Sequence, residues 1–265
     1  MKFRLGLGVL NKIFHLFKIF EKYIFKYLYA SNYELFKLKD TAKEETCLIL
    51  GNGPSLKNVD NKLLDKYISF GSNGVFLKYI PTYYITISRD FYTNYVTEIN
   101  NISCEYKFIE KSYNEIIDSN TIPMKCSWPN YGKFFNYMFQ VPLAYSLRPD
   151  KLIYLGGSVL FAQIQLAQWM GFKKIILLGV DHNMVSDDKR QYGGVSLSAE
   201  ETKDIHFSKD YKSSMKSDIM ATENAFRIAK YECEKAGIEI FNATPNTKLD
   251  VIKKLNLNLL NKDEY

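Results

Sequence analysis

The sequence contains few cysteines, and their spacing does not suit a metal site. Four are present, and no two of them form a Cys-x-x-Cys pair, so the pattern argues against zinc and favours reduced thiols. Cys47 falls in a predicted strand and Cys233 in a predicted helix, where cysteine commonly packs as a small apolar residue of the core. Reduced, buried cysteines are typical of a cytoplasmic protein.

The common nucleotide-binding signatures are also incomplete. A glycine-containing turn follows the strand predicted over residues 46–50, but it lacks the third glycine of the dinucleotide fingerprint and the Gly-Lys-Ser/Thr of a Walker loop. The chain has no Asp-x-Asp pair, which favours an enzyme that works without a metal. We therefore expect no metal and no bound cofactor.

No segment is apolar enough to span a bilayer, because charged residues interrupt the most hydrophobic one in every turn. That segment lies within residues 1–40, which hold eight Lys/Arg and three acids and so carry +5 of the formal net charge of +6. Polar residues recur every three or four positions over residues 9–28, which predicts a helix with a basic stripe and a wide apolar face.

Such a helix favours the surface of an anionic membrane, and we expect residues 1–29 to bind there. The alternative is packing against the domain or against another subunit of a homo-oligomer. The remaining 225 residues are nearly neutral, so the charge does not indicate a nucleic-acid partner.

The turn after the first predicted strand reads Gly51-Asn52-Gly53-Pro54-Ser55. Gly51 and Gly53 allow a sharp turn and a close approach of backbone N–H groups to a ligand. Asn52 and Ser55 add side chains that form hydrogen bonds. Open α/β sheets bind nucleotides where strands end in such turns, although a purely structural turn is the alternative.

A second motif begins at Gly157 and Ser158. Ser158 is a candidate N-cap for a helix over residues 158–170, and Gly171 ends that helix. The free N–H groups around Ser158 suit a phosphate, and an ordinary helix cap is the alternative. An apolar strand then leads to Asp181, which completes half of a βαβ unit.

The chain alternates strand and helix patterns from residue 46 onward. Strands are predicted over residues 47–50, 68–71, 84–87, 107–109, 175–179 and 239–241, and helices over residues 91–99, 158–170, 219–236 and 248–255. This order predicts a Rossmann-like α/β fold with a mostly parallel sheet and helices on both faces. Residues 112–150 show no clear pattern.

Residues 183–212 are polar and lack apolar periodicity. A segment of this length without regular structure is usually functional or disordered in a compact domain. We expect a basic segment over residues 1–40, followed by a single catalytic domain over residues 41–265 with a lid at about residues 183–212.

The order of the motifs resembles that of small bacterial sialyltransferases, which use CMP-sialic acid. The chain looks still closer to a broad group of 6-hydroxymethylpterin-diphosphokinase-like proteins, many of them attributed to surface-polysaccharide synthesis. The matching segments, within residues 46–255, are Gly51-Asn52-Gly53-Pro54-Ser55-Leu56, the Ser72-Asn73 turn, residues 171–181 and Pro245-Asn246-Thr247-Lys248-Leu249.

One departure concerns the donor sugar. Sialyltransferases carry an arginine just before the Thr-Ser-Gly that opens the central helix, whereas this chain has Tyr154-Leu155-Gly156-Gly157-Ser158. The donor sugar is therefore not fixed as sialic acid by the resemblance.

The resemblance also implies ligand contacts. Asn73 would contact the nucleotide or sugar, or would be a turn asparagine in a left-handed conformation. Asn246 lies in the last matching segment and is expected at the same site. Tyr192 and Tyr211 would hydrogen-bond the leaving phosphate, as lid tyrosines do in the sialyltransferases.

His206 is the predicted general base. The segment from Ile205 to Tyr211 resembles the one that carries the sialyltransferase base, and imidazole titrates near neutrality. His182, directly after Asp181, is the competing candidate. Asp90 and Asp181 follow predicted strands, and each would position a sugar hydroxyl. The alternative for Asp90 is a helix N-cap, and the alternative for Asp181 is a cap of its loop.

Together these features predict a metal-independent glycosyltransferase. It would move a sugar from a nucleotide-activated donor, with CMP-linked donors preferred, to a surface-glycan or lipid-linked acceptor, on the inner face of the cell membrane. The first alternative is an ATP-dependent pterin-type diphosphokinase, in which Asp90 and Asp181 would bind Mg²⁺. The second is a non-catalytic nucleotide-binding subunit of a polysaccharide assembly complex.

Overall fold

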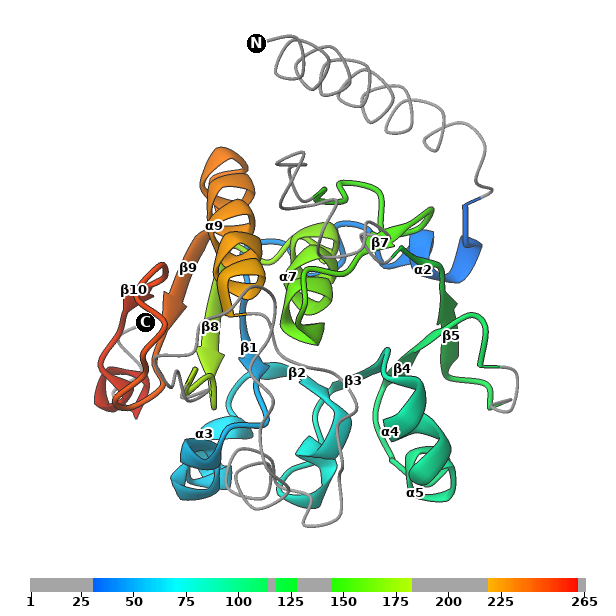
Figure 1. Cartoon of the computed structure of the whole chain (residues 1–265), viewed down its shortest axis with the longest axis horizontal. Coiled ribbons are helices and arrows are strands. Elements are labelled where there is room, and N and C mark those ends of the chain that lie inside the picture. Colours follow the sequence, from blue (N-terminus) through cyan, green and yellow to red (C-terminus); the bar gives the residue numbers. More distant parts are fainter. Residues whose placement is uncertain (1–30, 114–117, 128–143, 183–218, 262–265) are drawn as a thin grey trace, which may run out of the picture.

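An eight-stranded parallel sheet forms the centre of the computed structural model, which describes residues 31–113, 118–127, 144–182 and 219–261 (Figure 1). The strand order is β10 (Lys253–Lys254), β9 (Glu239–Asn242), β8 (Lys174–Leu178), β1 (Thr46–Leu50), β2 (Ile68–Ser72), β3 (Tyr83–Thr86), β4 (Tyr106–Glu110) and β5 (Thr121–Met124). Two further strands, β6 (Cys126–Ser127) and β7 (Ile153–Tyr154), form a separate parallel pair.

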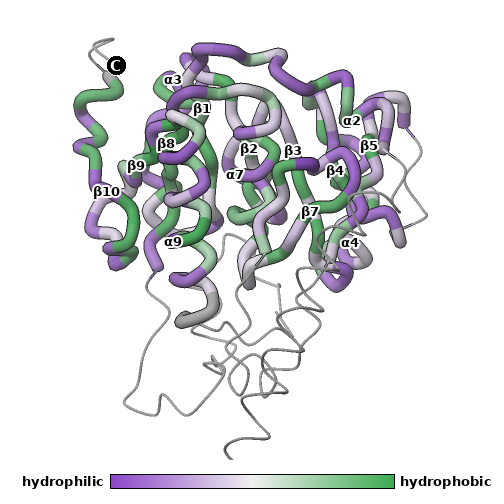
Figure 2. Tube along the Cα trace, turned by 90° about the horizontal axis from the view of Figure 1, so that it is seen from above, coloured by the Kyte–Doolittle hydropathy of each residue, from purple (hydrophilic) through white to green (hydrophobic). Residues whose placement is uncertain are grey.

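Helices cover both faces of the sheet, so the predicted Rossmann-like α/β class is confirmed. One face packs against α2 (Tyr33–Lys37), α7 (Val159–Met170) and α9 (Ile219–Lys235). The other packs against η1 (Pro54–Asn58), α3 (Asn61–Leu64), η2 (Asn73–Leu77), α4 (Arg89–Asn94), α5 (Val96–Asn100) and η3 (Leu257–Asn261). Figure 2 shows the central strands between α3 on one side and α9 on the other.

The central strands are apolar on both sides because both faces are covered. In β1, Cys47 and Ile49 face α7, whereas Leu48 and Leu50 face η1 and α3, and all four are fully buried. Cys233 is also fully buried and is a free thiol, as expected for a core cysteine. The six predicted strands and the helices over residues 158–170 and 219–236 are confirmed to within one residue at each end.

Two helix predictions need correction. Residues 91–99 form two short helices, α4 and α5, separated at Tyr95, where ψ is 24° and the ring stacks on Phe91 with centroids 4.6 Å apart. The helix predicted over residues 248–255 is wrong. The chain there is irregular, bends at residues 251–252 and then forms β10, while Leu249 and Ile252 are buried without forming a helix.

Short elements were missed where their local signals are weak. β5 contains Pro123, which is tolerated because β5 is an edge strand of the sheet. α2 has only five residues, yet its Leu35 is buried in the main core. The helix predicted within residues 1–30 lies outside the described residues. Within the described ranges, no helix combines the length and the apolar character needed to cross a bilayer.

Two buried glutamines on α7 differ in their hydrogen bonds. Gln165 Oε1 accepts hydrogen bonds from the backbone N–H of Ser146 (2.9 Å) and Tyr154 (3.2 Å), and its Nε2 donates to the carbonyl of Tyr154 (2.7 Å). This side chain therefore ties β7 to α7. Gln163 is equally buried, but among the described residues neither of its amide atoms has a partner.

We predict opposite outcomes for the matched substitutions Gln165→Leu and Gln163→Leu. The first leaves two backbone N–H groups unsatisfied near the core, so the free energy of unfolding should fall by about 2–4 kcal/mol. The second removes an unsatisfied amide and should change that free energy by less than about 1 kcal/mol, or raise it. Urea unfolding measures both, and equal losses would contradict the assignment.

Candidate functional site

The sheet has a topological switch point between β1 and β8. The chain proceeds from β1 outward through β2, β3 and β4 to β5, and then returns to place β8, β9 and β10 on the opposite side of β1. The connections that leave β1 and β8 therefore run to opposite sides. In open α/β sheets, ligands bind outside the carboxyl ends of the two strands at such a point.

The loops after β1 and β8 contact each other closely. Gly51 N donates to Leu178 O (2.7 Å) and Gly53 N donates to Gly179 O (2.9 Å). A Cβ at Gly51 would collide with the Gly179 carbonyl, and one at Gly53 with the Asp181 carboxylate. The two glycines are thus required by loop-to-loop packing, and their N–H groups are bonded within the protein.

Asp181 connects three segments. Its Oδ2 accepts a hydrogen bond from Ser55 Oγ (2.7 Å), and its backbone carbonyl accepts one from Lys248 N (2.9 Å). Two threonines that were not singled out from the sequence hold the preceding residue: Val180 N donates to Thr244 Oγ1 (2.9 Å), and Thr247 Oγ1 donates to Val180 O (2.7 Å). The placement of threonines directly after β9 is the signal that could have found them.

Polar contacts continue across the ends of β2 and β3. Asn52 Nδ2 lies 3.4 Å from Ser72 Oγ, and the buried Asn52 Oδ1 has no hydrogen-bond partner in the described part of the chain. Asn73 has a left-handed backbone with φ at 47°, and its Oδ1 accepts from Thr86 Oγ1 at 3.4 Å. Asn73 is therefore a left-handed turn residue whose side chain lies at this edge.

The N-terminus of α7 lies beside the start of α9. Ser158 is the N-cap, as predicted, and its hydroxyl accepts from Leu160 N (3.3 Å). Gly157 has φ at 81°, and a Cβ there would lie 3.2 Å from Thr222 Oγ1. The Thr222 side chain is buried, and its hydroxyl has no partner among the described residues. Thr222 was not predicted from the sequence.

His182 joins the end of β8 to α9. Its Nε2 lies 3.5 Å from Glu223 Oε1, and its backbone is left-handed with φ at 54°. Burial lowers the pKa of the His182 imidazole below its usual value, and the carboxylate of Glu223 opposes this shift. The imidazole is therefore held mainly neutral near pH 7.

These groups form a continuous edge that we call the polar rim. It follows the carboxyl ends of β8, β1, β2 and β3 and the N-termini of α7 and α9, and consists of Asp181, His182, Ser55, Asn52, Ser72, Asn73, Ser158, Thr222 and Glu223. Three of its polar atoms, Asn52 Oδ1, Thr222 Oγ1 and His182 Nε2, are buried without a hydrogen-bond partner in the ranges described. Such atoms are costly unless a ligand or water satisfies them.

Asp90 lies apart from Asp181. It is exposed in the first turn of α4, and the N-cap of that helix is Ser88, so the suggested capping role for Asp90 is wrong. Three strand spacings separate the ends of β3 and β8, roughly 14 Å, whereas one Mg²⁺ holds its ligands at about 2.1 Å. The two carboxylates do not fit a shared metal. No cluster of three potential metal ligands occurs among the described residues.

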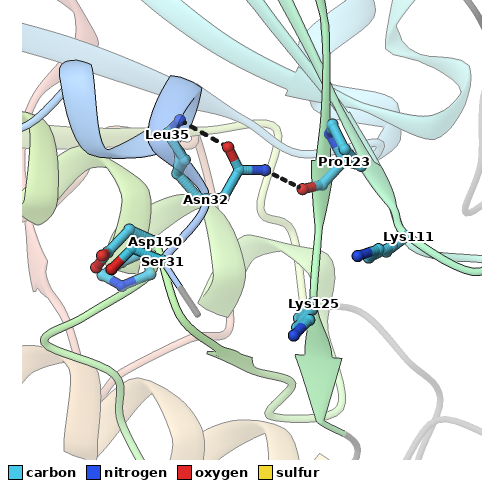
Figure 3. A pocket seen from close by; sticks show the side chains of 8 residues that line it. Ser31, Asn32, Leu35, Lys111, Pro123, Lys125 and Asp150 are labelled. Carbon is cyan, nitrogen blue, oxygen red and sulfur yellow. Dashed lines mark hydrogen bonds between the residues drawn. The ribbon is translucent and has the colours of Figure 1, made fainter. Parts of the chain in front are cut away.

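The remaining predicted residues divide into two groups. Asn246 is exposed in a left-handed turn with φ at 56°, in the segment whose Thr247 bonds Val180. His206, Tyr192, Tyr211 and the predicted lid over residues 183–212 lie outside the described residues. A cavity of about 140 Å³ lies elsewhere, between α2 and β5, and is lined by Asn32, Lys111, Lys125 and Asp150 among others (Figure 3).

Comparison with known proteins gives one family and one similar structure. The family model described as 6-hydroxymethylpterin diphosphokinase MptE-like matches residues 24–187, more than half of the chain. No curated protein matches the chain. A solved structure of the sialyltransferase CstII from Campylobacter jejuni, in complex with the substrate analogue cytidine-5′-monophosphate, is similar with 16% identity and a TM-score of 0.44, covering 82% of this chain and 87% of that one. A likeness of that size carries no argument about function.

We predict that His182 makes the fold sensitive to mild acid. Because its folded pKa is lowered, the unfolded chain binds more protons as the pH falls below about 6.5, and stability is lost over that range. His182→Asn keeps a residue that tolerates a left-handed backbone and removes the titration. Urea unfolding at pH 7.5 and 5.5 should show a smaller acid loss in the variant. An equal loss would show that the imidazole titrates alike in the folded and unfolded states, and a larger loss in the variant would show that it is charged and paired with Glu223 in the folded state.

Proposed function

We propose that this chain, which belongs to the 6-hydroxymethylpterin diphosphokinase MptE-like family, is a glycosyltransferase that binds a nucleotide-activated sugar along the polar rim. The donor we favour is a CMP-sugar, and the acceptor is a surface glycan or a lipid-linked saccharide. One observation carries the proposal: a buried Thr222 hydroxyl, which has no partner within the described ranges, lies against the N-terminus of α7, beside the switch point of a parallel sheet.

The N-terminus of α7 is the expected phosphate subsite. The helix dipole favours an anion there, and Thr222 Oγ1 adds a hydroxyl donor at Gly157. Negative charge develops on the nucleotide phosphate as the sugar leaves, so donors fixed at that point stabilise the leaving group. The nucleoside would extend toward Asn52 and Asn73 at the ends of β1 and β2.

The catalytic base is assigned to His206 on the resemblance described above, with Tyr192 and Tyr211 at the leaving phosphate. Within the described chain, His182 is held neutral and faces Glu223, which suits a positioning residue or a second candidate base. Asp181 is engaged by Ser55, so we assign it to holding the β1 and β8 loops together rather than to proton transfer.

Two other functions remain as alternatives. The family description favours a diphosphokinase, but the strands that precede the two aspartates suggested for its Mg²⁺, β3 and β8, end about 14 Å apart on strand spacing. A non-catalytic nucleotide-binding subunit would use the same rim without a base. We place the protein in the cytoplasm, at the inner face of the cell membrane, through residues 1–29.

A thermal-shift screen separates these functions. CMP, CDP, UDP, GDP and ATP are each tested with and without Mg²⁺. A selective rise in the melting temperature with CMP that does not need Mg²⁺ supports the transferase, and hydrolysis or transfer of a CMP-sugar separates an enzyme from a binding subunit. A selective rise with ATP that needs Mg²⁺ would support the diphosphokinase and overturn the proposal.

We predict that Thr222→Val weakens CMP binding without weakening the fold. The hydroxyl has no partner in the part of the chain that the structure describes, so its removal should leave the free energy of unfolding unchanged or raise it. Loss of one hydrogen bond to a phosphate should weaken the affinity about 10-fold in calorimetry. The control is Thr247→Val, whose hydroxyl bonds Val180 and Asn242 and whose loss should destabilise the fold. Unchanged affinity in Thr222→Val removes α9 from the site.

We predict that His206→Ala lowers turnover roughly 10²- to 10⁴-fold with little change in donor affinity, as expected for a lost general base. The ascending limb of the wild-type pH–rate profile should disappear in this variant. His182→Asn should be much milder. If His182→Asn is the inactive variant instead, the role of base passes to His182.

A further inference from the structure

An aromatic surface lies exposed on α2, directly after residues 1–30. Tyr33 is 68% exposed and Phe36 is 45% exposed. Leu147, which is 57% exposed, precedes Arg148, and the Arg148 guanidinium donates a hydrogen bond to Ser31. The ring of Phe36 is 6.2 Å from that of Trp169, and the Arg148 guanidinium is 5.8 Å from the same ring. We call the exposed Tyr33, Phe36 and Leu147, together with the buried Trp169 whose ring lies beside that of Phe36, the α2 surface.

The cations of the α2 surface are held over its rings. Lys37 Nζ lies 4.5 Å from the Tyr33 ring and Lys39 Nζ lies 5.6 Å from the Trp169 ring. Each is also paired with an acid, Lys37 with Glu34 and Lys39 with Asp40. The surface is therefore nearly neutral. Aromatic rings with lysine and arginine stems beside them are the composition that settles at a membrane interface.

The α2 surface is rigidly attached to the domain. Asn32 caps α2 by accepting from Leu35 N (3.1 Å) and fastens it to β5 by donating to Pro123 O (2.8 Å), as Figure 3 shows. Trp169 Nε1 donates to Leu35 O (2.9 Å). Ser31, where residues 1–30 end, accepts from Arg148 (3.2 Å). The α2 surface therefore follows directly after residues 1–30 in the chain.

We propose that the α2 surface docks onto an anionic phospholipid bilayer beside residues 1–30. Those residues carry six Lys/Arg and one acid, so they supply the attraction to anionic headgroups that the neutral surface lacks. Tyr33, Phe36 and Leu147 supply apolar area that enters the interface. The inference is independent of the reaction that the rim performs.

This docking fixes the orientation of the rim. Trp169 lies at the C-terminal end of α7, and Ser158 lies at the N-terminus of the same helix, about 17 Å away for 11 residues at 1.5 Å each. Figure 1 shows α2 and α3 far apart, with α2 beside β5 and α3 below the central strands, and α3 follows β1 in the chain. The rim therefore stands away from the bilayer, which suits an acceptor carried at the end of a saccharide chain.

Vesicle binding by the full chain tests the proposal. The vesicles contain phosphatidylcholine alone or with phosphatidylserine, and binding is followed by flotation. Tyr33→Ser/Phe36→Ser should weaken binding to the phosphatidylserine vesicles about 10-fold or more, while Tyr231→Ser/Leu77→Ser removes exposed apolar groups elsewhere and should bind as the wild type does. Tyr33→Ser alone should show a smaller loss, and it keeps the test available if the double variant does not fold.

A second readout locates the contact. The chain has two tryptophans, so Trp128→Phe leaves Trp169 as the only one, and brominated phosphatidylserine should quench its fluorescence. Wild-type binding by the double variant, or no quenching, would overturn the proposal and leave residues 1–29 as the only membrane contact. A change in oligomeric state without a change in vesicle binding would make the α2 surface an interface between copies of the chain, which also overturns it.

Discussion

The close contact between the loops after β1 and β8 is the constraint on which the rest of the site depends. Two neighbouring parallel strands end side by side, and their chains leave in opposite directions. Gly51 and Gly53 have no room for a side chain because the Gly179 carbonyl and the Asp181 carboxylate occupy that space. The resulting hydrogen bonds consume the N–H groups of both glycines. The loops therefore serve as a rigid floor, and ligand contacts must come from the residues around them.

Those residues are supplied by segments far apart in the chain. The ends of β2 and β3 bring Asn73 and Thr86 together, while the starts of α7 and α9 bring Gly157 against Thr222. Most polar atoms of the rim are satisfied within the protein, which fixes their positions. The few that are not, such as Thr222 Oγ1, lie where a phosphate would be held by the N-terminus of a buried helix. This combination of fixed and unsatisfied groups is what a preorganised anion site requires.

The sequence predicts the sheet well because strands buried on both faces read as continuous apolar runs, as in β1 and β8. Local signals also identify Ser158 as a cap and Gly171 as a helix end. It predicts poorly where tertiary contacts decide. β10 is two exposed lysines that pair with β9, and β5 tolerates Pro123 only because it is an edge strand. Thr222 and Glu223 could not be placed in the site, because their position depends on how α9 packs beside α7.

A crystal structure of the full chain soaked or grown with CMP tests the assignment of the polar rim most directly. We predict the phosphate at the N-terminus of α7, within hydrogen-bonding distance of Thr222 Oγ1, with the nucleoside lying over the ends of β1 and β2. A nucleotide bound away from the carboxyl ends of β1 and β8, or one whose phosphate is held by residues outside the polar rim, would contradict it.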